Sequence, residues 1–117
     1  MAIRQTFVES VVLNGSGAGE VSITARGDFD VQHTNVIVAP LPSVLVPTAQ
    51  LTLNGAPFEG SQTGDFDSSD TRHLMLAGDI LTCTWTGGDA GKRATFTVRG
   101  VEYPAGTGMK ATSGQGR

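Results

Sequence analysis

The sequence predicts an all-β domain: an antiparallel β-sandwich, jelly-roll-like in topology, with about eight short strands. The first observation behind this prediction is a period-two alternation of apolar and polar residues over many short stretches, typical of strands with one buried face. The second is the spacing of Gly-, Asn-, Asp- and Pro-rich clusters between those stretches, which is typical of sandwiches. An immunoglobulin-like sandwich is the alternative topology.

The length and composition fit one such domain. The chain has 117 residues, of which 38% are hydrophobic and only 16% are charged. One core is expected at this size. Exposed helices normally carry more Lys, Glu, Ala and Leu, whereas Thr, Val, Ser and Gly are abundant here. A surface of Thr, Ser and Gly also costs little to bury, so it suits contact with neighbouring subunits.

Residues 7–13 and 20–26 are the first two expected strands, separated by a glycine-rich turn. Because they are neighbours in the chain, we expect them to pair as a hairpin. Residues 30–39 form the next strand. Its Val36-Ile37-Val38 run is apolar on both faces, which indicates a strand inside a sheet or one covered by a partner.

Three prolines mark the segment that follows. Pro40, Pro42 and Pro47 cannot donate backbone hydrogen bonds, so residues 40–48 are expected to cross between sheets. This segment contains an apolar triplet over residues 44–46. Two interpretations remain open: the triplet is a contact site, or the crossover is tucked over one end of the sandwich.

A tight hairpin is expected around Asn54-Gly55, the strongest short turn signal in the sequence. The strands that flank it are expected over residues 49–53 and 56–63.

The last part of the chain supplies much of the expected core. A polar loop over residues 64–70 leads to a strand over residues 71–76. Residues 80–86 and 93–99 then flank a loop with three glycines, and we expect them to pair as a hairpin. The alternating apolar residues of this hairpin are expected to be buried: Leu81, Cys83, Trp85, Ala94, Phe96 and Val98.

The expected organisation is an N-terminal arm over residues 1–6, a sandwich over residues 7–103 and an extended tail over residues 104–117. The tail is rich in Gly and Thr and has no acidic residue. Such a segment would be disordered on its own. We expect the tail to become ordered by contact with a neighbouring subunit. Expected intersubunit contacts come from both ends and from the crossover, at Met1, Ile3, Arg4, Val44, Leu45, Tyr103, Met109, Lys110 and Arg117.

Two short motifs resemble binding sites but are better explained as turns. Asp65, Asp67 and Asp70 offer oxygen atoms of the kind that calcium prefers, yet the stretch lacks the glycine and distal glutamate of an EF-hand loop. The Arg-Gly-Asp tripeptide at residues 26–28 is known from receptor adhesion, and Gly-Asp is an ordinary turn pair. Neither a metal site nor a cofactor is predicted.

Catalytic residues are not predicted either. His33 and His73 are the only histidines, and no serine or cysteine has the local signature of an activated nucleophile. A triad assembled in space stays open.

The aromatic residues Trp85, Tyr103 and Phe58 are of the kind that stack on sugars in carbohydrate-binding sandwiches. Trp85 shares its strand face with Cys83 and Leu81, so we interpret it as a core residue.

Charge and targeting signals exclude several classes of function. The net charge is −3, and no cluster of Lys and Arg suggests a phosphate-binding surface, so no direct contact with nucleic acid is expected. We find no signal peptide and no apolar run near the ~20 residues that a membrane span needs. Cys83 is the only cysteine, which excludes an intramolecular disulfide. We expect synthesis in a cytoplasm and no membrane partner.

Three stretches resemble small virion proteins of tailed phages, particularly phages of actinobacteria. They are NGAPFEG at residues 54–60, DSSDTRH at residues 67–73 and AGDILTCTWTGGDAG at residues 77–91, within the half of the chain from residue 49 to residue 100. Such proteins are often compact β-sandwiches that decorate a capsid or surround the neck between head and tail. The resemblance implies this fold, a place in the virion after synthesis in the host cytoplasm, and no catalytic residues.

The leading hypothesis is therefore a non-enzymatic phage structural protein that decorates or reinforces the capsid or the head-to-tail neck. Its partners would be copies of itself and capsid, portal or neck proteins, bound through shape and multivalent contacts. The alternative is a glycan-binding module of a virion fibre or spike, using loops such as residues 64–70 and 87–92. A third hypothesis, a hydrolase, requires His33 or His73 within hydrogen-bond reach of a nucleophile.

Deleting residues 104–117 is expected to leave the sandwich folded and to abolish incorporation into virions, because the tail is expected to contact neighbours and not the core. Circular dichroism checks the fold, and the protein content of purified particles checks incorporation. A truncated protein that still assembles normally contradicts this prediction.

Overall fold

The computed structural model describes residues 2–104, and over this range the protein is all-β. No helix in this part of the chain is long and apolar enough to cross a membrane. The nine strands are β1 (Ile3–Val12), β2 (Gly19–Thr24), β3 (Asp28–Ala39), β4 (Thr48–Leu53), β5 (Ala56–Pro57), β6 (Gln62–Thr63), β7 (Phe66–Met75), β8 (Ile80–Thr86) and β9 (Arg93–Tyr103).

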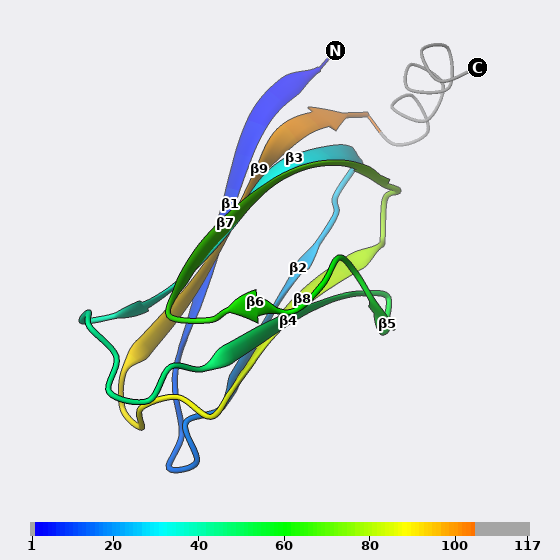
Figure 1. The fold of residues 1–117 in the computed structure, drawn as a ribbon. Helices are drawn as coiled ribbons and strands as arrows, with labels where there is room; N and C mark the ends of the chain where they lie inside the picture. The colour runs from blue at the N-terminus through cyan, green and yellow to red at the C-terminus, as the bar shows by residue number, and fades with distance from the viewer. Residues whose placement is uncertain (1, 105–117) are drawn as a thin grey trace.

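The strands form two packed antiparallel sheets (Figure 1). Sheet A has the order β1-β9-β3-β7, and sheet B has the order β2-β8-β4-β5, with β6 also paired to β4. Strands pair from the two ends of the chain inward: β1 with β9, β2 with β8, β3 with β7, and β4 with β5 and β6. This is a long hairpin rolled into a sandwich, so the jelly-roll prediction is confirmed.

The immunoglobulin-like alternative is wrong because of how consecutive strands are placed. That fold puts its first two strands in the same sheet. Here β1 lies in sheet A, β2 in sheet B, β3 in sheet A and β4 in sheet B, so each of these connections crosses between the sheets.

Two predicted hairpins are also wrong, because the two strands of each lie in different sheets. Residues 7–13 and 20–26 do not pair, since β1 pairs with β9 and β2 pairs with β8. Residues 80–86 and 93–99 do not pair either, because β8 lies in sheet B and β9 in sheet A. Alternation shows that each strand has one buried face. It does not show whether the next strand lies beside that strand or across the core from it.

The hairpin at Asn54-Gly55 is confirmed but is shorter than expected. Both residues have positive φ, 51° and 85°, and Leu53 pairs with Ala56 across the turn. The strand expected over residues 56–63 is present only as two short pieces, β5 and β6, and residues 58–61 between them lie outside the strands.

The loop expected over residues 64–70 is wrong from Phe66 onwards, since β7 begins there and pairs with β3 along its length. The polar residues at the start of β7 led to the prediction of a loop. β7 is an edge strand of sheet A, and most of its first half is exposed or half-buried, so it carries Asp and Ser where an interior strand carries apolar residues.

Three further expectations concern β3, the crossover and the N-terminal residues. β3 lies between β9 and β7, which confirms that the Val36-Ile37-Val38 run belongs to an interior strand. Residues 40–47 connect β3 in sheet A to β4 in sheet B, which confirms the crossover. Residues 3–6 belong to β1 and pair with β9, so they are not a separate arm.

The core lies between the sheets. All six core residues expected from residues 80–98 are confirmed, each with at most 1% of its surface exposed. The indole Nε1 of Trp85 donates a hydrogen bond of 3.1 Å to the carbonyl oxygen of Gly64, which satisfies the one polar group of this side chain. Burial raises the pKa of the Cys83 thiol to about 12, so this cysteine is a packed apolar group and not a nucleophile.

A β-bulge interrupts sheet A at one point. The register of β3 shifts between Val31 and His33. Relative to β9, Gln32 is an extra residue on β3, whereas relative to β7 the extra residue lies on β7. Gly100 of β9 pairs with Val31 at the bulge, and a Cβ atom at Gly100 would lie 2.1 Å from the carbonyl oxygen of Asp30. The close approach of β3 and β9 therefore requires glycine at position 100.

Gly100→Ala is expected to destabilise the fold by about 1–3 kcal/mol, because the added methyl group forces β3 and β9 apart at the bulge. Urea unfolding followed by Trp85 fluorescence measures this loss. Gly15→Ala is the control, since a Cβ there meets no atom within 4 Å and should change stability by no more than about 0.5 kcal/mol. Equal stability of Gly100→Ala and the wild type contradicts the prediction.

Candidate functional site

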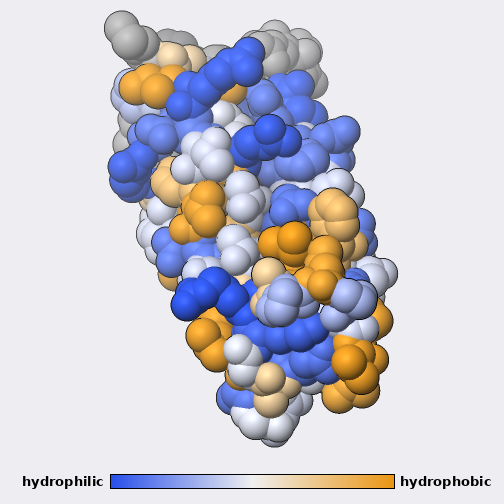
Figure 2. Space-filling model, turned by 90° about the vertical axis from the view of Figure 1, so that its left-hand side faces the viewer, coloured by the Kyte–Doolittle hydropathy of each residue, from blue (hydrophilic) through white to orange (hydrophobic). Residues whose placement is uncertain are grey.

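The crossover between the sheets exposes a group of apolar side chains at one end of the sandwich. Their exposed fractions are 47% for Leu41, 87% for Val44, 57% for Leu45 and 55% for Val46. We call these four residues the crossover rim. Figure 2 views the molecule from the side on which the crossover lies in Figure 1, and shows hydrophobic atoms in groups over its lower half, below a mainly hydrophilic upper part.

The exposed and buried residues of the crossover bear on both of its interpretations. Pro47 is buried and lies near Leu13 and Gly88, so the end of the segment does cover the sandwich. The apolar residues before it do not, because they point into solvent. That Val44 and Leu45 form a contact site stays a prediction.

Charged groups beneath the rim hold its backbone in one conformation. The Asp89 carboxylate accepts hydrogen bonds from the backbone N–H groups of Val44, at 2.8 Å, and Leu45, at 2.9 Å. Lys92 pairs with Asp89 at 3.1 Å and donates to the carbonyl oxygen of Pro42 at 2.9 Å. The Asp89 and Lys92 side chains are only 15% and 17% exposed. The rim is therefore presented by a fixed loop.

The electrostatics of Asp89 follow from these contacts. Hydrogen bonds from the backbone N–H groups of Leu45 and Val44 lower the pKa of its carboxyl group below the ordinary value, and Lys92 lowers it further. Asp89 is ionised at neutral pH, as a carboxylate that accepts two backbone hydrogen bonds must be.

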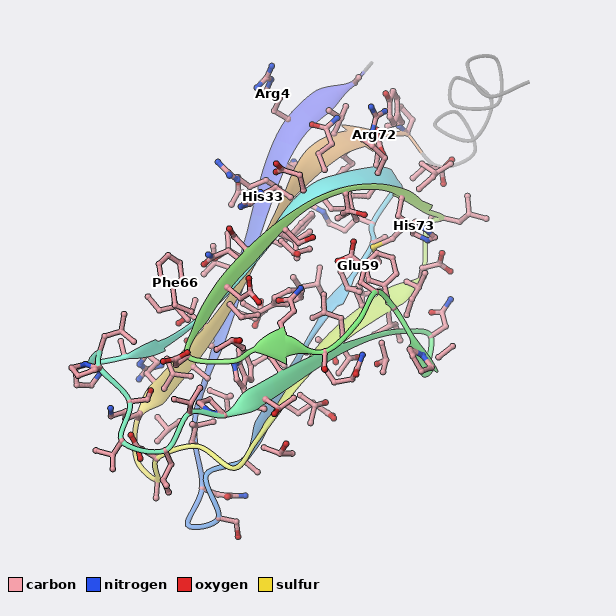
Figure 3. All side chains as sticks on the ribbon, viewed as in Figure 1. Arg4, His33, Glu59, Phe66, Arg72 and His73 are labelled. Atoms are coloured by element: carbon pink, nitrogen blue, oxygen red, sulfur yellow. The ribbon has the colours of Figure 1, made fainter. Side chains whose placement is uncertain are left out.

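A second feature is a row of polar side chains across the outer face of sheet A. Thr6 on β1 pairs with Arg99 on β9, Arg99 with His33 on β3, and His33 with Asp70 on β7. The Nδ1 atom of His33 lies 2.8 Å from a carboxylate oxygen of Asp70. A cavity of about 420 Å³ lies over this row and is also lined by Arg4. In Figure 3, Arg4 and His33 project from the side of sheet A that faces away from sheet B.

Sequence reasoning missed this cavity. It named Arg4, His33 and Asp70 for separate reasons and did not single out Arg99 or Gln32. Alternation along each strand marks outward positions, but the row combines four strands whose pairing is not readable from local patterns.

The expected turn over the three aspartates is only partly present. Asp67 accepts hydrogen bonds from the backbone N–H groups of Thr63 and Ser68, as short acids in turns do. Asp70 instead lies on the outer face of sheet A, paired with His33. Within residues 2–104, no three His, Cys, Asp or Glu side chains gather in a way that could hold a metal ion.

The Arg-Gly-Asp tripeptide at residues 26–28 is part of the scaffold. Arg26 pairs with Glu102 at 3.0 Å and lies over the ring of Phe7. Asp28 is 2% exposed and accepts a hydrogen bond from the backbone N–H of Ala77. The tripeptide is not displayed as a flexible loop.

The two histidines contact different groups. His33 contacts Asp70, and the ring of His73 packs edge-on against Phe58 with centroids 5.1 Å apart. In the described part of the chain, no hydrogen bond joins either ring to a serine, threonine or cysteine. The hydrolase hypothesis requires such a bond. Trp85 is fully buried and cannot stack on a sugar, which weakens the glycan hypothesis.

The structure divides the expected intersubunit residues into two groups. Ile3, Arg4 and Tyr103 lie where β1 begins and β9 ends, and Val44 and Leu45 lie at the opposite end of sheet A (Figure 1). Ile3 is 50% exposed, Arg4 is exposed and Tyr103 is half-buried. Met1, Met109, Lys110 and Arg117 lie outside the described residues, as does the tail beyond Pro104. That any of these residues contacts another subunit stays a prediction.

Comparison with known proteins assigns no family, because the chain matches no protein-family model and none of the curated proteins.

Replacing Asp89 with alanine is expected to destabilise the fold in a pH-dependent way. The pKa of Asp89 is lower in the folded protein than its ordinary value of 3.8, so the unfolded chain takes up the proton first as the pH falls. The stability difference between wild type and Asp89→Ala should be full above about pH 5 and disappear as the pH drops below 3.8. Urea unfolding at a series of pH values measures it.

Asp65→Ala is the matched control for this prediction. It removes one negative charge, but the Asp65 carboxylate has no hydrogen-bond or ion-pair partner within residues 2–104. This variant should show no such pH-dependent difference from the wild type. A constant difference between Asp89→Ala and the wild type from pH 7 to pH 3 would show that Asp89 does not hold the rim through its charge.

Proposed function

We propose that this chain is a non-enzymatic structural protein of a tailed-phage virion, made in the host cytoplasm. Copies of it would decorate or reinforce the capsid or the head-to-tail neck, by contacting one another and capsid, portal or neck proteins. The observation that carries the proposal is the crossover rim: four exposed apolar side chains on a loop that the partly buried Asp89 and Lys92 hold in place.

The rim has the properties of an interface and not of a packing defect. Exposed apolar residues that occur singly need no explanation, whereas a contiguous group rimmed by polar residues marks an interaction site. Asp89 and Lys92 are largely withdrawn from water to fix this loop. A fixed loop loses little conformational entropy when a partner covers it, so more of the burial energy remains as affinity.

The fold and the arrangement of the other contact candidates agree with this role. Jelly rolls occur in viral capsid proteins, and also in lectins and cupins, so the topology is compatible with the proposal without selecting it. Ile3 and Arg4 lie at the end of sheet A opposite to the rim. A subunit with contacts at both ends joins two neighbours at once, and several weak contacts in one particle then reinforce each other.

The glycan-binding alternative has less support. Of the three aromatic residues considered for a sugar platform, Trp85 is buried, Phe58 packs against His73 and Tyr103 is half-buried, so they form no common exposed surface; Phe66 is exposed by itself on β7. The loop over residues 87–92 is engaged in holding the crossover through Asp89 and Lys92.

The double variant Val44→Ser/Leu45→Ser tests the proposal in the full-length chain. Each fully buried aliphatic side chain contributes about 1.5–3 kcal/mol, so removing two should weaken self-association at least tenfold. Sedimentation velocity over a concentration series measures this association, and virion content measures incorporation. Val8→Ser is the control, since Val8 is 56% exposed on the flat outer face of sheet A, and it should associate like the wild type.

Two results would contradict the proposal. One is a wild-type protein that stays monomeric at high concentration and is absent from purified particles. The other is a double variant that associates and enters particles as the wild type does.

A further inference from the structure

The cavity on the outer face of sheet A is shaped by the backbone as well as by side chains. It has a volume of about 420 Å³ and receives residues from β1, β3, β7 and β9. Gln32, which is an extra residue of β3 relative to β9, belongs to its lining, and Gly100 contributes backbone without a side chain. Bulges are over-represented next to functional sites, where they re-aim a side chain.

The cavity is lined by two arginines that, in the part of the chain that the structure describes, differ from other arginines in having no partner. Arg26 pairs with Glu102 and Arg72 pairs with Asp30, at 3.0 Å and 2.8 Å. In contrast, the guanidinium groups of Arg4 and Arg99 have no ion-pair or hydrogen-bond partner within residues 2–104.

The pairing of strands brings these two arginines together. Arg4 pairs with Val101 and Thr6 pairs with Arg99, so Arg4 and Arg99 are diagonal neighbours on one face of the sheet. Like charges in this relation repel each other. The one acid in the cavity, Asp70, is already hydrogen-bonded to His33 and is 93% exposed. An anion bound between the arginines would relieve the repulsion.

We infer that this cavity is a binding site for a carboxylate or sulfate group carried by a small polar ligand. A guanidinium group donates two parallel hydrogen bonds to such an oxyanion, which makes Arg99 the principal anchor and Arg4 the second. Gln5, Thr6 and Gln32 supply neutral donors and acceptors for the uncharged part of the ligand. The volume lies in the range of small-ligand sites.

The charge of the whole chain favours a small ligand over nucleic acid. The chain carries 11 acidic and 8 basic residues, for a net charge of −3. This excess repels a polyanion that extends beyond the cavity, whereas a single oxyanion interacts only with the local cluster. An acidic sugar and a free anion both present the required group, and the experiment separates them.

The test is a titration of the 15N-labelled full-length protein at low ionic strength, followed by NMR. The probes are sodium glucuronate, sodium acetate, sodium sulfate and neutral glucose. We expect the anions to shift the amide resonances of Gly100 and His33 and the Nε resonance of Arg99. Arg99→Gln should weaken their binding about tenfold, because the paired hydrogen bonds to a charged group are lost.

Arg93→Gln is the matched control for Arg99→Gln. Arg93 lies on the outer face of the same strand, donates a hydrogen bond to the hydroxyl of Ser10, and does not line the cavity. Binding should be unchanged in this variant. Val44→Ser/Leu45→Ser should bind the anions normally, which separates failure of this inference from failure of the assembly proposal.

Glucuronate binding more tightly than acetate, with loss in Arg99→Gln, supports the inference and identifies an acidic sugar as the ligand. Equal binding of glucuronate, acetate and sulfate, with the same loss, supports a site for free anions. Three results overturn the inference: no localised shift with any anion, shifts by glucose as large as those by glucuronate, or equal weakening in Arg93→Gln and Arg99→Gln.

Discussion

The packing of sheet A against sheet B is the interaction on which the rest of this structure depends. The strands that pair come from opposite ends of the chain, as β1 and β9 show, where Ile3 lies beside Glu102. Most connections cross between the sheets, so neither sheet is a local unit that can form alone. Apolar side chains of both, such as Trp85 from sheet B and Phe96 from sheet A, are fully buried in one cluster between them. The native contacts are therefore mostly long-range, and burial in this core compensates for the loop entropy lost in closing them.

Both candidate surfaces follow from this arrangement. The crossover rim is on a connection between the sheets, and it is fixed because Asp89 and Lys92, on the neighbouring crossing loop between β8 and β9, hold it. The cavity is on the face of sheet A that the core does not use, where the register between β3 and β9 shifts at Gln32. The apolar surface and the basic cavity are thus separate, which allows one scaffold to carry an assembly contact and a ligand site independently.

Much of the fold was predictable because burial leaves a local trace in the sequence. Alternation identified the inward residues from Leu81 to Val98, the prolines identified the crossover, and Asn54-Gly55 identified the tight turn. The partners of each strand were not predictable, because β8 and β9 have the same alternation whether they lie side by side or face each other. β7 was partly mistaken for a loop since a polar edge strand has little apolar signal.

The crossover rim was more predictable than the cavity, because its residues are neighbours in the chain and those of the cavity are not. Val44 and Leu45 are adjacent in the chain, so their apolar character was visible before their exposure was known. Arg99, His33 and Asp70 come from three strands, and only the register places them in one row. The role of Asp89 was hidden because its partners lie more than 40 residues away in the chain.

Amide hydrogen exchange of the wild-type protein tests most directly whether the two sheets form one cooperative unit that holds the rim rigidly. The most protected amides of β8 and β9, one strand from each sheet, should open with the same free energy. The amides of Val44 and Leu45, which donate to Asp89, should exchange far more slowly than those of an unprotected loop. Opening free energies that differ between the sheets by more than about 2 kcal/mol, or rapid exchange at Val44 and Leu45, would contradict this account.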